Sequence, residues 1–283
     1  MFYSQHKLLV VLVGVFFFSA IFSAYAEGLR KPAAVDLSTS ATLSLPSITV
    51  LYDNNPFRRG LGSSWGFSCL VQGLDKTILF DTGGNDPLLL GNMKKLGIDP
   101  GVVHCVVLSH FHMDHVGGLG RFLAVNPDVT VYMLSSFPDQ FKSNVRRSGA
   151  GVKEVDKPVN ICRGVFSTGT LGAWIKEQSL VIKTNKGIVV ITGCAHPGVV
   201  KIAGKAKALS GDDVLLVMGG FHLVSAGATR INEIISSLQE MDVKYAAPCH
   251  CSGDTASYLF EKKYGKNFIK IGAGKKIILE DLD

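Results

Sequence analysis

A short run of the chain, His110 to His115, concentrates side chains that bind metal ions. It reads His-Phe-His-Met-Asp-His and directly follows an apolar segment that ends at Leu108-Ser109. Imidazoles are the usual ligands of zinc-like ions, and a carboxylate binds a second cation. On a tight loop at a strand end, one pair of ligands can face one metal and the other pair its neighbour. Two such metals, roughly 3.5–4 Å apart, activate a water for hydrolysis.

Three more histidines each follow a strand-like segment. They lie in Thr192-Gly193-Cys194-Ala195-His196-Pro197-Gly198, in Gly219-Gly220-Phe221-His222-Leu223 and in Pro248-Cys249-His250-Cys251-Ser252-Gly253. Beyond His6, only His104 lies outside the run and these three motifs. We therefore expect the histidine-bearing loops to gather at one edge of the fold.

The order of the expected elements is that of an α/β protein. Strands are predicted at 48–52, 67–71, 77–80, 105–108, 129–133, 180–184, 188–192, 214–218 and 245–247, and two short strands are expected to close the chain. Helices are predicted at 87–96, from 116 onward, and at 199–209, 230–241 and 256–264. Residues 135–158 are predicted to form an irregular, substrate-facing loop. Both halves begin with β hairpins and continue with β–α alternation, which predicts a four-layer αββα sandwich.

These motifs resemble the metallo-β-lactamase fold superfamily, and the resemblance covers nearly all of residues 48–283. The finer resemblance is to the branch named for 7,8-dihydropterin-6-methyl-4-(β-D-ribofuranosyl)aminobenzene 5′-phosphate synthase, also described as metal-dependent hydrolases of the β-lactamase superfamily. Besides the histidine motifs, the matching segments are Ile48-Thr49-Val50-Leu51-Tyr52-Asp53-Asn54, Leu79-Phe80-Asp81-Thr82-Gly83 and Val107-Leu108-Ser109-His110.

The resemblance implies a role for each motif residue. The ligand sets are His110, His112 and His196 for a first metal, and Asp114, His115 and His250 for a second. Asp114 would also orient the attacking water and act as a catalytic residue. Asp81 is expected to support the metal loop instead of binding metal, because ligating imidazoles need a partner for their other nitrogen. The cofactor is one or two divalent ions, zinc first, with manganese or iron also suited to the site.

One motif departs from the superfamily pattern. Many members place a bridging Asp between the third and the last histidine motif, but the matching strand end here carries Gly219-Gly220-Phe221-His222. Asp212 and Asp213 precede that strand and lie at its wrong end. His222 is therefore either a ligand or a catalytic acid/base, and the site is mononuclear or dinuclear.

The N-terminus has the pattern of an export signal. Lys7 is followed by an apolar stretch from Leu8 to Phe18 and by the small-x-small signal Ala24-Tyr25-Ala26. The apolar run is about eleven residues, whereas a membrane span needs about twenty. We expect a signal peptide at 1–26, an irregular lead-in at 27–46 and a metallo-β-lactamase-like domain at 47–283. The mature protein would be periplasmic or secreted without a stable membrane anchor; an uncleaved anchor is the alternative.

The distribution of charge and of cysteines indicates which classes of partner and which covalent links to expect. The net charge is +6, but the paired basic residues Arg58-Arg59, Arg146-Arg147 and Lys275-Lys276 form no stripe, so we expect a small-molecule substrate and no nucleic acid. The sequence assigns no disulfide among its six cysteines. Trp65, Phe67 and the loop around Arg146-Arg147 are candidates for the pocket wall.

The leading functional hypothesis is an exported metal-dependent hydrolase acting on an ester, lactone, amide or phosphoester bond. The first alternative is a transferase like the synthase of the resembling branch. The second is a non-enzymatic metal-binding protein, because Cys194, Cys249 and Cys251 flank the histidines. An extended segment 249–251 would point both of its thiols away from His250 and disfavour that reading.

Overall fold

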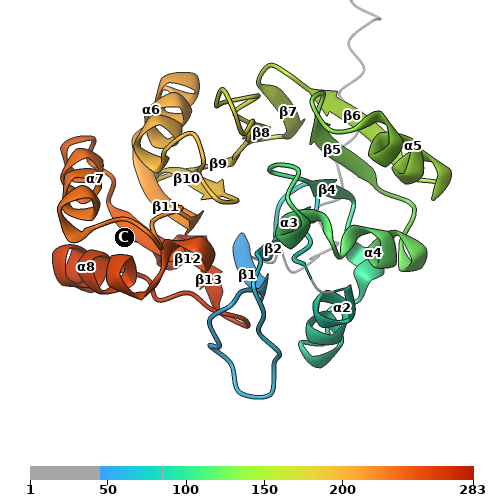
Figure 1. Ribbon diagram of the computed structural model, residues 1–283, viewed down its shortest axis with the longest axis horizontal. Coiled ribbons are helices and arrows are strands. Elements are labelled where there is room, and N and C mark those ends of the chain that lie inside the picture. The colour runs from blue at the N-terminus through green and yellow to red at the C-terminus, as the bar shows by residue number, and fades with distance from the viewer. Residues whose placement is uncertain (1–44, 85) are drawn as a thin grey trace, which may run out of the picture. The chain divides into compact units, whose positions relative to one another are not determined.

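Two β sheets form the centre of the computed structural model, which describes residues 45–84 and 86–283 (Figure 1). The first sheet has the order β13-β1-β2-β3-β4-β5-β6. Its strands are β1 (Ser47–Tyr52), β2 (Ser68–Gln72), β3 (Ile78–Phe80), β4 (Cys105–Val107), β5 (Thr130–Leu134), β6 (Gly151–Val155) and β13 (Lys276–Ile278). The second has the order β12-β11-β10-β9-β8-β7. Its strands are β7 (Val159–Cys162), β8 (Val165–Ser167), β9 (Leu180–Thr184), β10 (Gly187–Thr192), β11 (Val214–Gly220) and β12 (Tyr245–Cys249).

Helices cover the outer faces of both sheets, as Figure 1 shows. Those beside the first sheet are α2 (Asp86–Lys95), α3 (Met113–Val116), α4 (Leu119–Val125) and α5 (Asp139–Arg147). Those beside the second are α6 (Val199–Ser210), α7 (Ala228–Glu240) and α8 (Asp254–Tyr264). Short 3₁₀ turns are η1 (Pro100–Val102), η2 (His250–Ser252), η3 (Gly265–Asn267) and η4 (Leu279–Asp281). The predicted α/β sandwich is confirmed.

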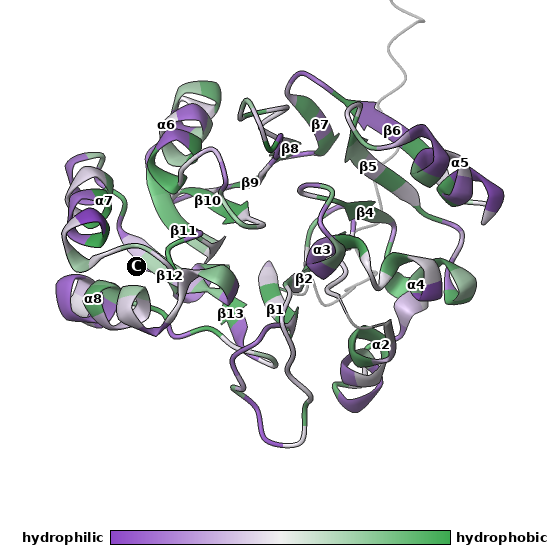
Figure 2. Ribbon diagram, in the orientation of Figure 1, coloured by the Kyte–Doolittle hydropathy of each residue, from purple (hydrophilic) through white to green (hydrophobic). Residues whose placement is uncertain are grey.

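Strand β10 shows how the sequence produces the layers. Successive side chains of a strand point to opposite faces of its sheet. Val189 and Ile191 belong to the apolar cluster shared with the first sheet. Ile188 and Val190 belong to a second cluster, which includes the buried faces of α6, α7 and α8. Because both faces of β10 are covered, the strand is apolar throughout, and Figure 2 shows the same hydrophobic colouring over the central strands.

The prediction for residues 135–158 was wrong. This segment holds helix α5 and strand β6 instead of an irregular loop. Helix α5 buries little apolar surface, chiefly Val145 with the partly buried Phe141 one turn before it. β6 is an edge strand in which only Val155 is fully buried. Each element therefore offers few apolar residues to a sequence prediction, although Phe141 and Val145 have the four-residue spacing of a helix face.

The structure also differs from the prediction in where some helices begin and in how many strands are present. Strands β7 and β8 were not predicted, and among residues 45–84 and 86–283 a single short strand, β13, closes the chain where two were expected. The helix expected from Val116 begins earlier, at Met113, and is divided into α3 and α4. The hairpin of β9 and β10 is confirmed, with Gly187 paired to Thr184.

The topology brings the histidine loops to one edge. β3 and β4 run parallel, as do β10, β11 and β12, so the loops after these strands leave their sheets at carboxyl ends. The predicted signal peptide and most of the predicted lead-in lie outside the described residues. Within the described ranges, no helix combines the length and the apolar composition needed to cross a membrane.

Candidate metal centre

The first group of potential ligands is made of three imidazoles. His110 and His112 come from the loop between β4 and α3, and His196 from the loop between β10 and α6. One ring nitrogen of each lies within 4.8 Å of the others. Nε2 of His196 is buried and has no hydrogen-bond partner among the described residues. A buried polar atom without a partner is costly in a protein, and a metal ion at this point would satisfy it.

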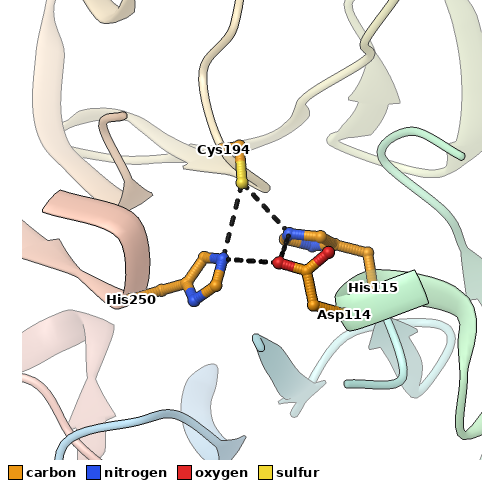
Figure 3. Close-up of side chains that lie close together, drawn as sticks. All are labelled: Asp114, His115, Cys194 and His250. Atoms are coloured by element: carbon orange, nitrogen blue, oxygen red, sulfur yellow. Dashed lines mark hydrogen bonds and ion pairs between the residues drawn. The ribbon is translucent and has the colours of Figure 1, made fainter. Parts of the chain in front are cut away.

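The second group surrounds a single point with four donor atoms of three elements (Figure 3). Oδ2 of Asp114 lies 3.3 Å from Nε2 of His250 and 3.6 Å from Nε2 of His115. Sγ of Cys194 lies 3.1 Å from Nε2 of His115 and 3.4 Å from Nε2 of His250. Four such donors are the number that a structural zinc site uses.

Acceptors behind the imidazoles orient them toward these points. Oδ2 of Asp81 lies 2.7 Å from Nδ1 of His115, and Oδ1 of Asn54 lies 2.9 Å from Nδ1 of His250. An acceptor on Nδ1 keeps the proton there and leaves the lone pair of Nε2 free for a cation. The expected supporting place of Asp81 therefore agrees with its position, although its effect on a metal stays a prediction.

Asp81 also holds the start of the histidine run. Its two carboxylate oxygens accept hydrogen bonds from the backbone N–H and the hydroxyl of Ser109, both at 2.7 Å. The Ser109 hydroxyl in turn lies 2.9 Å from Nδ1 of His110. One buried carboxylate thus connects a residue of each ligand group.

Glu177 plays a similar part for the loop after β10. One carboxylate oxygen accepts the backbone N–H groups of Gly193, Cys194 and Ala195, and the other accepts that of His196, at 2.9–3.1 Å. Burial raises the pKa of this carboxyl to about 7. The four donors wrap the loop around the carboxylate and set the positions of Cys194 and His196.

The loops at this edge hold unusual backbone conformations. Asp81, Ala195, His222 and His250 have φ between 48° and 56°, a left-handed region that side chains other than glycine rarely adopt. Each such residue costs about 1–3 kcal/mol and persists where surrounding contacts hold it. Four of these residues at one edge indicate a site whose geometry is held at some cost in stability.

The charges favour neutral imidazoles in the first group. Burial together with the neighbouring histidines lowers the pKa of His110 well below its usual value and that of His196 to about 4. The pKa of His112 is also lowered, chiefly by burial. Neutral imidazole is the form that binds metal, so the group is ready to bind at neutral pH.

The pKa of Asp114 is lowered, whereas the pKa of His222 is raised. Burial opposes ionisation of Asp114, but the hydrogen bond with His250 and the charges of His115 and His250 together hold its pKa well below its usual range. His222 interacts with the Cys251 thiol, which raises the pKa of this imidazole against the effect of burial. Asp114 is thus an anion, and His222 retains a proton more readily than a free histidine.

Comparison with known proteins identifies the domain. Residues 66–170 match the family model described as the metallo-beta-lactamase superfamily. The chain carries a metallo-beta-lactamase domain. It is 29% identical over 269 residues to a 7,8-dihydropterin-6-methyl-4-(beta-D-ribofuranosyl)-aminobenzene-5′-phosphate synthase of Methanocaldococcus jannaschii, covering 79% of this chain and 92% of the relative. The predicted resemblance to the superfamily and to its synthase-named branch is confirmed.

Solved structures agree. A crystal structure described as a metal-dependent hydrolase of the beta-lactamase superfamily matches with a TM-score of 0.70 and 28% identity, over 82% of this chain and 98% of that chain. The metallo-beta-lactamase fold protein YhfI from Bacillus subtilis matches with a TM-score of 0.60 and 15% identity, over 82% and 99% of the two chains. This second likeness concerns the fold alone.

A cavity opens beside the first ligand group of the metallo-beta-lactamase domain. It has a volume of about 380 Å³ and is lined by Gly172, Ala173, Trp174, Ile175, His196, Pro197, Lys201 and His222. The Trp174 side chain is 98% exposed at this rim. Beside the second ligand group, the half-exposed ring of Trp65 lies 4.9 Å from that of His250, measured between ring centroids. Trp65 therefore remains a candidate for the pocket wall.

The other pocket-wall candidates lie elsewhere. Phe67 is fully buried and packs edge-on against Phe80 in the core. Arg146 lies on α5, where it forms an ion pair with Glu154 of β6 at 3.0 Å. Neither residue lines the cavity beside His196.

The structure brings the six assigned ligands into the two expected groups, while His222, the possible further ligand, lies in neither; metal binding itself stays a prediction. Sequence reasoning left Cys194 unassigned and missed Glu177. Cys194 had one signal, its place two residues before His196; Glu177 is an isolated acid in a loop and had none. The extended geometry considered for 249–251 was wrong, because this segment turns through η2 at His250, and the six cysteines are all free thiols.

Proposed function

We propose that this protein is a metal-dependent hydrolase that uses a His/Asp centre with one or two divalent ions, zinc first. The observation that carries the proposal is the unpaired, buried Nε2 of His196, which faces the same region as His110 and His112 beside an open cavity. Three protein ligands with an accessible fourth position are typical of catalytic zinc sites, whereas structural sites are closed. This openness supports an enzyme over a non-enzymatic metal-binding protein.

A bound metal ion and two side chains would have separate roles in the hydrolysis. A bound divalent ion would supply a water of lowered pKa and polarise the scissile carbonyl or phosphoryl bond. The Asp114 carboxylate, ionised and 22% exposed, accepts a hydrogen bond from the attacking water and orients it. His222, exposed at the cavity and inclined to keep its proton, donates that proton to the leaving group.

The substrate of this proposal is a small molecule with an ester, lactone, amide or phosphoester bond. Trp174 and Ile175 provide an apolar rim for the part that does not react, and Lys201 adds a positive charge to the cavity wall. Scattered basic pairs in the sequence do not support nucleic acid as a partner.

We also propose that the protein is exported. The support is the sequence of residues 1–26, with Lys7, the apolar stretch and Ala24-Tyr25-Ala26. Cleavage after Ala26 leaves a periplasmic or secreted chain without a stable membrane anchor.

A transferase is the second candidate, favoured by the name of the archaeal relative. For such a transfer, the two ligand groups would hold ions that neutralise the pyrophosphate released when a pterin substrate is joined to an aminobenzene ribotide. An exported location disfavours it, because such substrates are cytoplasmic. Proteins of one fold catalyse different reactions, and the residues of the site decide which one, so the relative's name alone does not decide the reaction of this protein.

The test begins with elemental mass spectrometry on protein purified without chelators. The metal-loaded protein is then screened against ester, lactone, amide and phosphodiester substrates, with the pterin transfer assayed in parallel. The proposal expects at least one ion per chain and a hydrolysis that chelation abolishes and zinc restores. Absence of bound metal after incubation with zinc, manganese and iron would contradict it, and so would transfer without hydrolysis.

A further inference from the structure

A third group of donor atoms lies beside the two already described. Sγ of Cys194, Sγ of Cys251 and a ring nitrogen of His222 lie within 4.8 Å of one another. The three residues follow three neighbouring parallel strands, β10, β11 and β12. Both thiols are buried, with exposed fractions of 3% for Cys194 and 2% for Cys251, whereas His222 is exposed at the cavity.

The backbone at the end of β11 makes room for this group. A Cβ atom on Gly220 would lie 2.7 Å from Sγ of Cys251 and 3.2 Å from Cα of Cys194. The same Cβ atom would lie even closer to the carbonyl oxygen of Gly193, so the absence of a side chain at Gly220 lets this carbonyl and the Cys251 sulfur approach the strand. This is the strand end that carries no carboxylate in this chain.

The loops that carry the two thiols are fixed to each other. Gly220 donates a backbone hydrogen bond to Gly193 at 3.0 Å, and its carbonyl accepts one from the Thr192 hydroxyl at 2.8 Å. Leu223 donates to the carbonyl of Cys251 at 3.1 Å, which ties the loop after β11 to η2. Backbone contacts at three strand ends thus hold the loops that carry the donor atoms. An ion could therefore bind with little rearrangement of these loops.

We propose that Cys194, His222 and Cys251 form an additional metal site for a thiophilic divalent ion, such as zinc or cadmium. Two thiolates and one imidazole form a donor set suited to these ions, and two thiolate charges balance the charge of a dication. The fourth position faces the cavity through the exposed His222, and an ion bound here would take this imidazole out of its proposed role as proton donor. Because Cys194 also belongs to the second group, its sulfur links the two sites.

The experiment uses cadmium as the probe, because thiolates bound to cadmium absorb in the near ultraviolet. The purified protein is stripped of metal under reducing conditions and titrated with Cd²⁺, and native mass spectrometry counts the ions per chain. Cys251→Ser removes a donor of the third group alone. Cys249→Ser is the matched control, because Cys249 is equally buried two residues away and belongs to none of the three groups.

The expected result is one ion fewer per chain and a reduced near-ultraviolet absorbance in Cys251→Ser, with Cys249→Ser indistinguishable from the parent protein. His222→Ala is the second variant, since its exposed side chain is not needed for the core, and it too should bind one ion fewer. An unchanged ion count in both variants would overturn the proposal, even with reduced absorbance, because the ion would then lie in the neighbouring group.

The readout is independent of the proposed hydrolase activity. If the parent protein hydrolyses none of the substrates and Cys251→Ser still lacks one ion, the proposed function fails and the additional site stands. If hydrolysis is found and the ion count is the same in all variants, the additional site fails and the proposed function stands.

Discussion

Oδ2 of Asp81 lies 2.7 Å from Nδ1 of His115, and both side chains are completely buried. Asp81 has a φ of 52°, so the chain adopts a strained conformation at the residue that makes this contact. Because the carboxylate holds the proton on Nδ1, the lone pair of Nε2 faces Asp114 and Cys194. The strain, the burial and the hydrogen bond together orient one imidazole of the second ligand group.

Replacing Asp81 by asparagine tests this orientation. Asparagine tolerates positive φ and keeps an oxygen acceptor, but it loses the charge that stabilises the imidazole proton. We expect metal affinity of the second group to fall by about 10–100-fold, as measured by competition with a chromophoric chelator. Asp128→Asn, at an exposed position, serves as the control. Equal affinities of the two variants would contradict the assigned support.

His112→Ala tests the first group. His112 is only partly buried, so the fold should be retained, as checked by circular dichroism. Because a catalytic metal contributes several kcal/mol and about 1.4 kcal/mol is tenfold in rate, turnover should fall by at least about a hundredfold. His104→Ala, outside all three groups, should leave turnover unaltered. Unchanged turnover in His112→Ala would remove the first group from the reaction.

Glu177→Gln tests the loop after β10. The amide can present its oxygen to one set of donors only, and its own N–H₂ then faces a backbone N–H of the loop. One buried N–H left unsatisfied costs about 1–3 kcal/mol of unfolding free energy, which urea denaturation measures. Metal binding by the His110, His112 and His196 group should weaken in parallel, because His196 moves. Glu261→Gln, on the exposed face of α8, is the control. A loss of stability without weaker metal binding would mean that the position of His196 does not depend on Glu177.

The metal-free protein should lose stability in mild acid. The pKa of His196 is lowered to about 4 in the folded state from an ordinary value of 6.5, and those of His110 and His112 are lowered too. Between these pH values the three histidines bind more protons in the unfolded chain than in the folded one. Glu177, with a folded pKa of about 7, opposes this by one proton, so the free energy of unfolding should still decrease as pH falls from about 6.5 to about 4. Urea midpoints measured across this range check the sign, and a midpoint that rises on acidification would contradict neutral imidazoles in the folded state.

Export predicts a defined mature N-terminus. Cleavage after Ala26 leaves 283 − 26 = 257 residues beginning at Glu27. Intact-mass analysis of the periplasmic or secreted fraction should give the mass of that chain. Recovery of the protein in the cytoplasm with residues 1–26 attached would contradict export and strengthen the transferase alternative.

Short sequence motifs predict the metal-binding residues at this edge of the fold. His110 to His115 lie within six consecutive residues, and His196, His222 and His250 each follow a predicted strand, so their types and spacing predict metal binding. The same local patterns predict β9, β10 and α7, where period-two or helical apolar repeats face a core on at least one side. Polar α5 and the edge strand β6 carry few apolar residues, and they depend on contacts with each other and on the pairing of β6 with β5.

Residue type and order by themselves predicted the resemblance to the superfamily and the layered α/β architecture, because these depend on short motifs and on apolar periodicity, and the resemblance implied the two ligand sets. Only the tertiary structure decided which partners support them. Asn54 meets His250 across 196 residues, and Glu177 meets the loop at Cys194 across 17. The tertiary structure also placed Cys251 beside Cys194, where the absence of a side chain at Gly220 lets its sulfur approach the strand. Such contacts depend on how separate strand ends are brought to one edge, and no local pattern specifies that placement.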